Sequence, residues 1–338
     1  MADFTSEEVQ KATGARLLSS VGSVLFHDVC TDTRAVEKGS LFVAFKGTSF
    51  DGHDFVLKAL SSGAAGAVVS ELRPEYKGAA VPIFVVPDTL KAYQDLARFH
   101  RRRFSIPVIA VTGSVGKTST RNMIAAVLSK KYKVLQTEKN YNNEIGLPKT
   151  LFQLTADHEA CVVEMGMRGL GQIAELVDIG EPTIGVVTNV GKSHIELLGS
   201  QENIAKAKSE LVQGLDANGT AILNGDDPFV APMQDLCQGR SILYGTGESA
   251  HIRAENIVCD EKGVRFTCHC FDRTFDVSVP VIGRHNVYNA LAAIAAGYVT
   301  GLSDSELQAG LSAYRGMAMR QELLHLGPYT FINDTYNA

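Results

Sequence analysis

Short apolar runs alternate with amphipathic segments along most of the 338-residue chain. From residue 108 the alternation is regular, because strand-length apolar runs are followed by segments whose apolar residues recur with a helical period. This pattern predicts an α/β fold with a doubly wound, mostly parallel sheet, which binds ligands at the carboxyl ends of its strands. The strands that we expect are 108–111, 134–136, 161–164, 184–188 and 221–223, and the helices are 118–131 and 285–300.

The first hundred residues predict a smaller α/β unit. Its expected elements are strands at 40–45, 67–70 and 83–86, helices at 55–62 and 89–102, and a short N-terminal helix capped by Ser6. Pro107 marks the boundary with the regular pattern that follows. We therefore predict an N-terminal domain at 1–103, a central domain at 104–317, and the start of a third domain at 318–338 with its first strand at 328–333.

Composition and charge narrow the function classes. The chain is 45% hydrophobic and 20% charged with a net charge of -5, which is typical of a globular protein and disfavours a nucleic-acid partner. The densest basic run, Arg101–Arg103, is expected to be the solvated end of a helix. No apolar stretch approaches the ~18 residues of a membrane span, and the acidic N-terminus lacks the apolar core of a secretory signal.

The cysteines do not predict a metal site. Six are present without a CxxC motif. In the tripeptide Cys268–Cys270 the two cysteines would share one face of a strand while His269 points to the other, so three ligands from this tripeptide are not expected. Reduced thiols and a cytoplasmic location are favoured instead.

The strongest local motif is TGSVGKT at residues 112–118, which directly follows a strand and precedes a helix. Gly113 and Gly116 allow a tight turn whose amides converge on phosphate, and the helix adds the positive end of its dipole. Lys117 would reach the β- and γ-phosphates, and Thr118 would place a hydroxyl on magnesium. The longer motif GxxxxGK[ST] has a glycine where Val111 stands here, so a glycine turn without nucleotide is the alternative.

The short form TGSVGKT resembles the phosphate loop of the Mur ligases and of the related folylpolyglutamate synthases. Further segments resemble the Mur ligase family in the same order along the chain. They are CVVEMGMR at 161–168, TNVGKSHIELLGS at 188–200, AKAKSEL at 205–211 and GRHNVYNA at 283–290. The resemblance implies an ATP-dependent ligase that activates a carboxylate as an acyl phosphate, which an incoming amine then attacks.

The resemblance also implies a set of site residues. Nucleotide contacts would come from Gly113, Ser114, Val115, Gly116, Lys117, Thr118, Ser119, Asn289, Arg320 and Asp334. Two magnesium ions would be held by Thr118, Glu164, His194 and a carbamylated Lys208. The catalytic residues would be Lys117, His194, Lys208 and Arg320, the last as a cation that approaches the γ-phosphate when domains close.

Three of these residues have plain structural alternatives. Glu164 ends an apolar strand, where a carboxylate suits a hard magnesium ion but could equally pair with a neighbouring base. His194 on its own would be a surface histidine. Lys208 must become neutral to react with carbon dioxide, and Lys206 competes with it; an ordinary solvated lysine is the alternative for both.

Within the family, three segments resemble the member that adds D-alanyl-D-alanine to a UDP-linked muramoyl tripeptide in peptidoglycan synthesis. They are EMGM at 164–167, NYNNEIGLP at 140–148 and NDTYNA at 333–338. The resemblance implies substrate contacts from Thr33 and Arg34 near the uridine diphosphate, and from Asn142, Asn143 and Arg168 near the peptide. It also implies a monomer.

Two other functions stay open. A sibling ligase would add a diamino acid, or glutamates to folate, and a nucleotide-dependent binding module would not ligate at all. The sequence given ends within the segment that resembles the opening of the family's third domain. We therefore expect these 338 residues to bind ATP without robust ligation.

Overall fold

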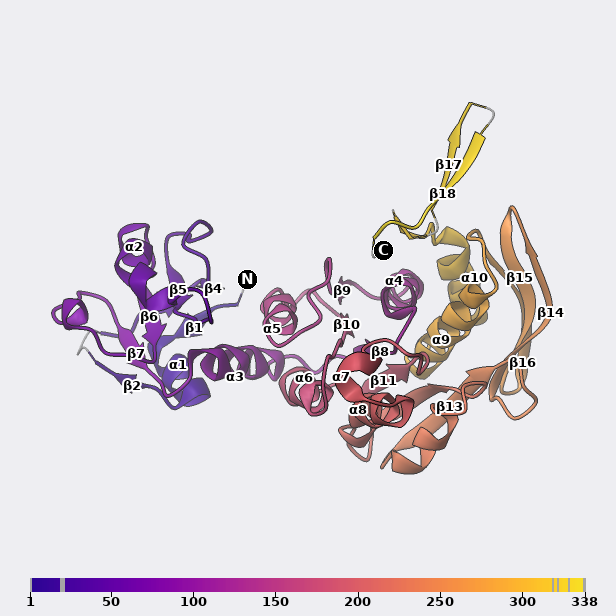
Figure 1. The fold of residues 1–338 in the computed structure, drawn as a ribbon, viewed down its shortest axis with the longest axis horizontal. Coiled ribbons are helices and arrows are strands. Elements are labelled where there is room, and N and C mark those ends of the chain that lie inside the picture. Colours follow the sequence, from indigo (N-terminus) through magenta and orange to yellow (C-terminus); the bar gives the residue numbers. More distant parts are fainter. Residues whose placement is uncertain (1, 19–21, 318, 321, 328, 337–338) are drawn as a thin grey trace. The chain divides into compact units, whose positions relative to one another are not determined.

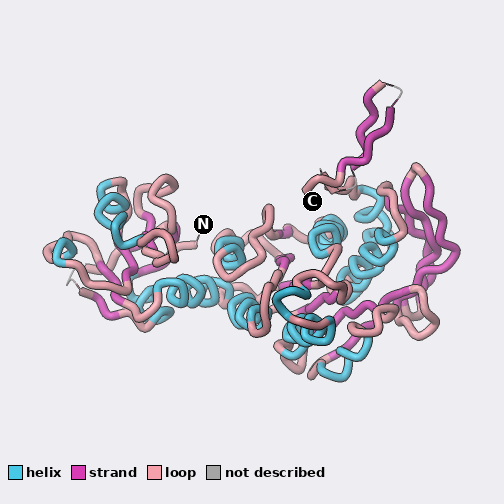
Figure 2. The backbone as a smooth tube through the Cα atoms, viewed as in Figure 1, coloured by secondary structure: helices cyan, strands magenta, loops and turns pink. Residues whose placement is uncertain are grey.

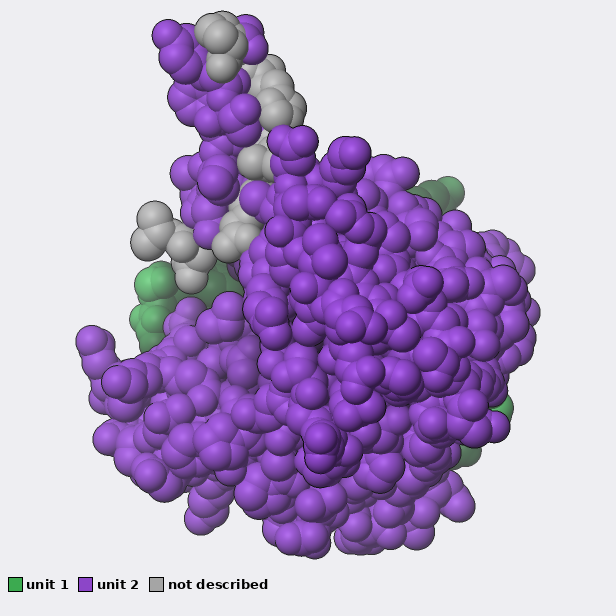
Figure 3. Space-filling view, turned by 90° about the vertical axis from the view of Figure 1, so that its right-hand side faces the viewer, with its two compact units in different colours: residues 1–105, 144–156, 178–180 green, residues 106–143, 157–177, 181–338 purple. Residues whose placement is uncertain are grey.

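The computed structural model describes residues 2–18, 22–317, 319–320, 322–327 and 329–336 (Figure 1). The chain divides into two compact units, which Figure 3 colours separately. Unit 1 comprises residues 1–105, 144–156 and 178–180, and unit 2 comprises residues 106–143, 157–177 and 181–338. Both units contain helices and strands (Figure 2).

Unit 1 is built on a five-stranded sheet of order β2-β7-β6-β5-β4. Strands β4 to β7 run parallel, and β2 pairs with β7 in the antiparallel sense. The elements of unit 1 are β1 (Phe4–Thr5), α1 (Ser6–Thr13), β2 (Arg16–Leu17), β3 (Leu25–Phe26), β4 (Asp28–Cys30), β5 (Ser40–Val43), η1 (Gly52–Phe55), α2 (Val56–Ser61), β6 (Gly66–Val69), η2 (Pro74–Tyr76), β7 (Ile83–Val85), α3 (Thr89–Arg101) and α5 (Gly146–Leu151).

The cap of helix α1 differs from the prediction by one residue. Thr5 is the N-cap: its Oγ1 accepts the Glu8 N–H at 3.2 Å, and the Glu8 carboxylate accepts the Thr5 N–H at 2.9 Å. Ser6 instead accepts the Val24 N–H at 3.1 Å. Adjacent hydroxyls compete for the cap in the sequence, and the contact with Val24 decides between them.

The basic run at the end of α3 is solvated only in part: Arg102 and Arg103 are exposed, as predicted, but Arg101 is buried. Arg101 is only 7% exposed, and its guanidinium donates to the carbonyls of Gly180 at 3.2 Å and Phe104 at 2.7 Å. Arg103 lies over the ring of Phe4, with 4.9 Å between guanidinium carbon and ring centroid. These arginines therefore stabilise unit 1, because each cation is held by carbonyls or an aromatic face.

Unit 2 is built on a nine-stranded sheet of order β16-β15-β14-β13-β12-β11-β8-β10-β9. Neighbouring strands are parallel from β9 to β14, and β14, β15 and β16 are antiparallel. The elements that belong wholly or largely to unit 2 are β8 (Val108–Thr112), α4 (Lys117–Leu128), β9 (Val134–Gln136), β10 (Ala160–Glu164), α6 (Gln172–Gly180), β11 (Ile184–Val187), α7 (Ile195–Leu198), α8 (Gln201–Gln213), β12 (Thr220–Asn224), η3 (Ala231–Leu236), β13 (Arg240–Gly245), β14 (Ile252–Asp260), β15 (Gly263–Cys270), β16 (Arg273–Val279), α9 (His285–Val299), α10 (Asp304–Ala313), β17 (Glu322–Leu326) and β18 (Tyr329–Asn333).

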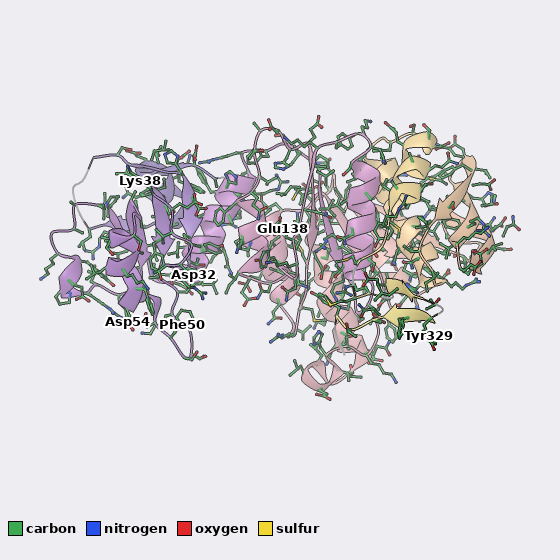
Figure 4. The ribbon with its side chains drawn as sticks, turned by 90° about the horizontal axis from the view of Figure 1, so that it is seen from above. Asp32, Lys38, Phe50, Asp54, Glu138 and Tyr329 are labelled. Atoms are coloured by element: carbon green, nitrogen blue, oxygen red, sulfur yellow. The ribbon has the colours of Figure 1, made fainter. Side chains whose placement is uncertain are left out.

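The predicted fold class, a small α/β unit followed by a largely parallel sheet, is confirmed. The antiparallel extension β14–β16 was not predicted. The strand expected at 328–333 is present as β18, but it is the second strand of a hairpin with β17, on which Tyr329 is exposed (Figure 4). The first predicted boundary lies close to residue 105, although 144–156 and 178–180 also join unit 1; the three-domain assignment stays a prediction.

Helix α4, which follows the first strand of unit 2, is fixed in place by close packing against two other helices. A Cβ on Gly310 of α10 would lie 2.5 Å from the Val127 Cα of α4, so the two helices pack backbone to backbone. The alanine-rich helix α9 is buried along most of its length and also packs on α4. Helix α4 is thereby fixed on the sheet by two neighbours, and its N-terminus has a defined place at the end of β8.

The cysteine prediction on β15 is confirmed. Cys268 and Cys270 are fully buried, and burial raises the pKa of both thiols. His269 points to the other face, where its Nε2 lies 2.9 Å from the Glu255 carboxylate. Among the described helices, none combines the length and apolar character that crossing a bilayer requires.

Candidate functional site

The predicted phosphate loop, residues 112–118, joins β8 to α4 in unit 2. Gly113 (φ 151°) and Gly116 (φ 84°) adopt backbone conformations that side chains disfavour, and a Cβ on Gly113 would overlap the Thr188 side chain. The Lys117 side chain folds back over the loop, where its Nζ donates to the Gly113 carbonyl at 2.8 Å. The turn therefore requires glycine, and the Lys117 ammonium lies against the backbone of the loop.

Asn189, which the sequence reasoning missed, fixes this loop from the end of β11. Its carbonyl accepts the Ser114 N–H at 3.0 Å, and its side-chain oxygen accepts the Val115 N–H at 2.9 Å. These two amides are therefore engaged inside the protein rather than directed at a ligand. The donors that remain for an anion come from the first turn of α4, which begins at Lys117.

Glu164 ends β10 beside the loop and is 3% exposed. Its Oε2 accepts the Thr118 hydroxyl at 2.8 Å, and its Oε1 accepts the Asn142 amide at 2.8 Å. Its Oε2 also lies 3.4 Å from the Arg121 guanidinium. The structure thus joins the predicted residues Thr118, Glu164 and Asn142, and it shows the pairing with a base that was the structural alternative for Glu164.

Arg121 was missed, although the helical period could have found it. It lies three residues after Thr118, so both side chains share one face of α4. Arg121 is 2% exposed, and it also donates to the Lys139 carbonyl at 3.3 Å and the Asn122 side chain at 2.8 Å. Burial lowers its pKa, while the Glu164 charge raises it.

The two competing lysines of α8 differ in burial. Lys208 is 3% exposed, whereas Lys206 is exposed. Burial, together with the nearby Lys117 charge, lowers the pKa of the Lys208 ammonium to about 7. Much of this side chain is therefore a neutral amine at neutral pH, which is the form that reacts with carbon dioxide.

His194 begins helix α7 with a positive φ of 63° and an exposed side chain. Burial of part of the ring lowers its pKa, and so do the charges of Lys117, Lys208 and Arg168. The imidazole thus faces the same cations as the phosphate loop. Among the described residues, no group of three or more histidine, cysteine, aspartate or glutamate side chains is arranged to hold a metal ion.

A cavity of about 870 Å³ opens beside the phosphate loop in unit 2. Its lining joins residues from the loop, from the ends of β11 to β13, from the start of α9 and from the segment after α10; among these are Val115, Gly116, Ser119, Asn189, Asp226, Asn289, Arg320 and Asp334. The predicted nucleotide contacts Asn289, Arg320 and Asp334 therefore share one cavity with the loop.

The polar side chains of this cavity are held unequally. Asn289 accepts the Thr120 hydroxyl at 2.9 Å and donates to Asn286 at 2.9 Å, so it is locked against α4. Arg320 lies over the Tyr336 ring at 4.1 Å, and its buried Nε has no hydrogen-bond partner among the residues that the structure describes. Asp226, which the sequence reasoning missed, accepts the hydroxyls of Thr246 at 2.7 Å and Tyr288 at 2.9 Å.

The predicted substrate residues lie in two places. In unit 2, the Asn142 carbonyl also accepts the Gly166 N–H at 2.8 Å, and Asn143 is the next residue along the chain. Arg168 is exposed in the loop after β10. In unit 1, Thr33 and Arg34 follow β4. The exposed Arg34 guanidinium forms an ion pair with Asp32 (labelled in Figure 4) at 2.6 Å. Asp32 has its pKa lowered to about 2 by this arginine.

Family models match both parts of the chain. Residues 25–101 match the model described as "Mur ligase family, catalytic domain", and residues 111–297 match that described as "Mur ligase middle domain". A Synechocystis UDP-N-acetylmuramoyl-tripeptide--D-alanyl-D-alanine ligase is 46% identical over 93% of this chain and 67% of its own length. The chain therefore spans about two thirds of that relative.

Solved structures agree with these matches. MurF from Acinetobacter baumannii has a TM-score of 0.94 at 31% identity and covers all of this chain, which covers 74% of it. MurF ligase from Thermotoga maritima in complex with ADP has a TM-score of 0.83 at 28% identity, over 92% of this chain and 71% of that one. The chain therefore belongs to the Mur ligase family of ATP-dependent ligases.

Proposed function

We propose that this chain binds magnesium ATP in the cavity of unit 2 and uses it to join D-alanyl-D-alanine to UDP-N-acetylmuramoyl-tripeptide, as its relatives are named. One observation carries the proposal. The Lys117 ammonium, the start of α4 and the unpartnered Nε of Arg320 supply donors in the region of the same cavity. Convergent cationic donors of this kind suit a polyphosphate.

The residues present fit a nucleotide. Gly113 and Gly116 allow the tight turn that leads into α4, and the Arg320 Nε has no acceptor among the described residues, so a phosphate oxygen could provide one. Asn289 and Asp226 line the same cavity with fixed orientations, because each is hydrogen-bonded to its neighbours. Ordered polar groups of this kind would orient the nucleoside.

The residues also fit magnesium. Magnesium is held by one or two carboxylates together with substrate phosphates, so a complete protein cage is not needed. Thr118 and Glu164 would supply two oxygens beside the phosphate loop. His194 and a carbamate on Lys208 would serve a second ion, since both side chains lie close enough to Lys117 to feel its charge. Magnesium would neutralise the charge that gathers on the transferred phosphate.

The chain's own cations would do the remaining electrostatic work. A carboxylate has no leaving group, so the terminal carboxylate of the tripeptide must first accept a phosphoryl group and become an acyl phosphate. Lys117 and Arg320 would stabilise the negative charge of this step. The amine of D-alanyl-D-alanine would then attack the acyl carbon, and phosphate would leave.

The substrate side of the proposal rests on the strand ends. Thr33 and Arg34, at the carboxyl edge of the unit 1 sheet, would contact the uridine diphosphate. Asn142, Asn143 and Arg168 would contact the muramoyl peptide. A cytoplasmic location belongs to the same proposal, because UDP-linked precursors are intracellular compounds, and the monomeric state is proposed from the family resemblance alone.

Calorimetric titration with magnesium ATP tests the nucleotide site. We expect a saturable site that is lost in Lys117→Met and kept in the control Lys130→Met, whose exposed cation follows the same helix. A well-folded chain without saturable binding would overturn the proposal.

Mass spectrometry of the products tests the substrate. D-alanyl-D-alanine, a diamino acid and glutamate with a folate should each be offered with ATP and the matching carboxylate. A product only with D-alanyl-D-alanine would support the proposal, and a product only with another acceptor would replace it with the sibling ligase. Nucleotide binding without any product in the longest form of the protein would favour the binding module.

A further inference from the structure

Arg121 forms a buried polar cluster with Glu164, Asn142 and the Lys139 carbonyl, and no step proposed above uses this arginine. The cluster connects α4, the end of β10 and the asparagine-rich segment 139–143. Within the described residues, Glu164 is the carboxylate that pairs with Arg121. Both side chains are almost fully buried, at 2% and 3% exposure.

The positive charge of Arg121 offsets the negative charge of Glu164. A buried carboxylate without a cation is costly, so the guanidinium compensates Glu164 when no metal ion is present. The same Oε2 that lies 3.4 Å from Arg121 also accepts the Thr118 hydroxyl at 2.8 Å. Thr118 and Glu164 are the oxygens that would hold a divalent cation under the proposed function, so such an ion would meet a fixed positive charge within a few ångströms.

We propose that Arg121 is a resident counter-ion of Glu164 that stabilises the metal-free chain and competes with the divalent cation. Removing its charge makes the metal-free chain less stable and the cation affinity higher. If Arg121 only positioned Glu164, removing its charge would lower the cation affinity, because a misplaced ligand binds the ion more weakly. The sign of the affinity change therefore separates competition from simple support.

The competition has a consequence for the asparagine-rich segment. Arg121 donates to the Lys139 carbonyl, Lys139 has a positive φ of 48°, and Asn142 donates to the other oxygen of Glu164. A cation that draws Glu164 away from Arg121 therefore loosens the contacts that hold residues 139–143. Ion binding is in this way coupled to the segment proposed to contact the peptide.

The inference rests on the proposed metal role of Glu164, and the experiment checks that role first. Manganese is titrated by electron paramagnetic resonance in the presence of saturating ADP, with wild type and Glu164→Gln compared. If Glu164→Gln binds manganese as wild type does, the proposed role of Glu164 fails. If Glu164→Gln binds manganese more weakly, Glu164 contributes to the metal site, and the Arg121 variants then test the competition.

Arg121→Met should then bind manganese about tenfold more tightly than wild type, as removal of a nearby unit charge predicts. Arg121→Lys keeps the charge and should stay within about twofold. Lys130→Met, an exposed cation just beyond the same helix, controls for net charge. Manganese affinity that is unchanged or weaker in Arg121→Met overturns the competition.

Stability gives an independent readout. In EDTA without nucleotide, the urea midpoint of Arg121→Met should fall by roughly 0.5 M, because Glu164 is left uncompensated, and Lys130→Met should keep the wild-type midpoint. Arg121→Gln, which can still donate to the Lys139 carbonyl, replaces Arg121→Met if the latter does not fold. Amide hydrogen exchange at residues 139–143 should increase in wild type when manganese and ADP are added, and unchanged exchange would contradict the coupling.

Discussion

Each unit carries polar side chains at the carboxyl edge of its parallel strands, but the two edges hold them differently. In unit 2, Glu164 at the end of β10 and Lys208 on helix α8 are each 3% exposed, and Glu164 is hydrogen-bonded from three neighbours. In unit 1, the Arg34 side chain is 86% exposed and its partner Asp32 is 44% exposed. The parallel-sheet topology predicts a site at the carboxyl ends of the strands in both units. Only in unit 2 are the side chains buried, which makes that site dry and ordered.

This difference predicts how strongly each edge responds to substitution. Buried charges lose their solvation and their partners together, whereas exposed ion pairs contribute little to stability. Changes at the unit 2 edge should therefore reduce function or binding strongly. Changes at the unit 1 edge should reduce ligand affinity modestly and leave folding almost unchanged.

The largest effect is expected at Lys208. Replacing it by Met removes the amine that would carry the carbamate, so any turnover that wild type shows with ATP and both peptide substrates should fall about a hundredfold. We expect wild type to give a carbamate signal in carbon-13 NMR with labelled bicarbonate, and this signal should be absent from the variant. Lys206→Met, two positions away and exposed, should keep both. Equal losses in the two variants would remove the contrast between buried and exposed lysines.

Gly113→Ala should follow, with nucleotide affinity about thirtyfold weaker. The added Cβ meets the Thr188 side chain at a φ of 151°, and strain of about 2 kcal/mol would displace the loop. Gly78→Ala in unit 1 is the control, because its φ of 82° is also strained but nothing lies within 4 Å. Calorimetry with magnesium ATP would measure the difference, and normal affinity in Gly113→Ala would contradict a rigid loop.

A smaller effect concerns pH and the interior of unit 1, away from its strand edge. Burial lowers the pKa of His100 from 6.5 to about 4, and its Nε2–H donates to the Leu154 carbonyl at 3.0 Å. The folded state disfavours the proton that the unfolded state binds below pH 6.5. Stability is therefore present above pH 6.5 and declines as the pH falls toward about 4, by roughly 1–2 kcal/mol between pH 7 and pH 5.

Urea unfolding at these two pH values measures the contribution of His100. The variant His100→Phe keeps an aromatic ring next to Phe104 and Phe152 but cannot titrate, so its stability should change less between pH 7 and pH 5. The same pH slope in both proteins would assign the loss to other groups. That result would also show that His100 is not a buried titrating group comparable with Lys208 of unit 2.

The smallest effect is expected at Arg34. Arg34→Ala should weaken binding of UDP-N-acetylmuramoyl-tripeptide about fivefold, since it removes one exposed cation. The unfolding midpoint should stay within error of wild type, because the pair with Asp32 is solvated. A marked loss of stability would mean that the unit 1 edge is as ordered as that of unit 2.

The sequence alone determined the framework of this protein. Apolar periodicity located the strands that lead to the loop, to Glu164 and to His194, because strands and helices differ in period. It also predicted the phosphate loop and the fold class, since glycine, lysine and hydroxyl spacing depends on local backbone geometry. The antiparallel strands β14–β16 were missed although they are consecutive and joined by short turns, because exposed residues alternate with buried ones along them and they lack the continuous apolar run of the central strands.

Tertiary structure decided which polar groups are buried and what they contact. Lys206 and Lys208 look alike in the sequence, and only packing makes Lys208 a buried lysine with a lowered pKa. Asn189 on the phosphate loop and Arg121 on Glu164 depend on contacts between strands and helices far apart along the chain. Desolvation and hydrogen bonding act only after the chain has folded, so no local pattern could have assigned these partners.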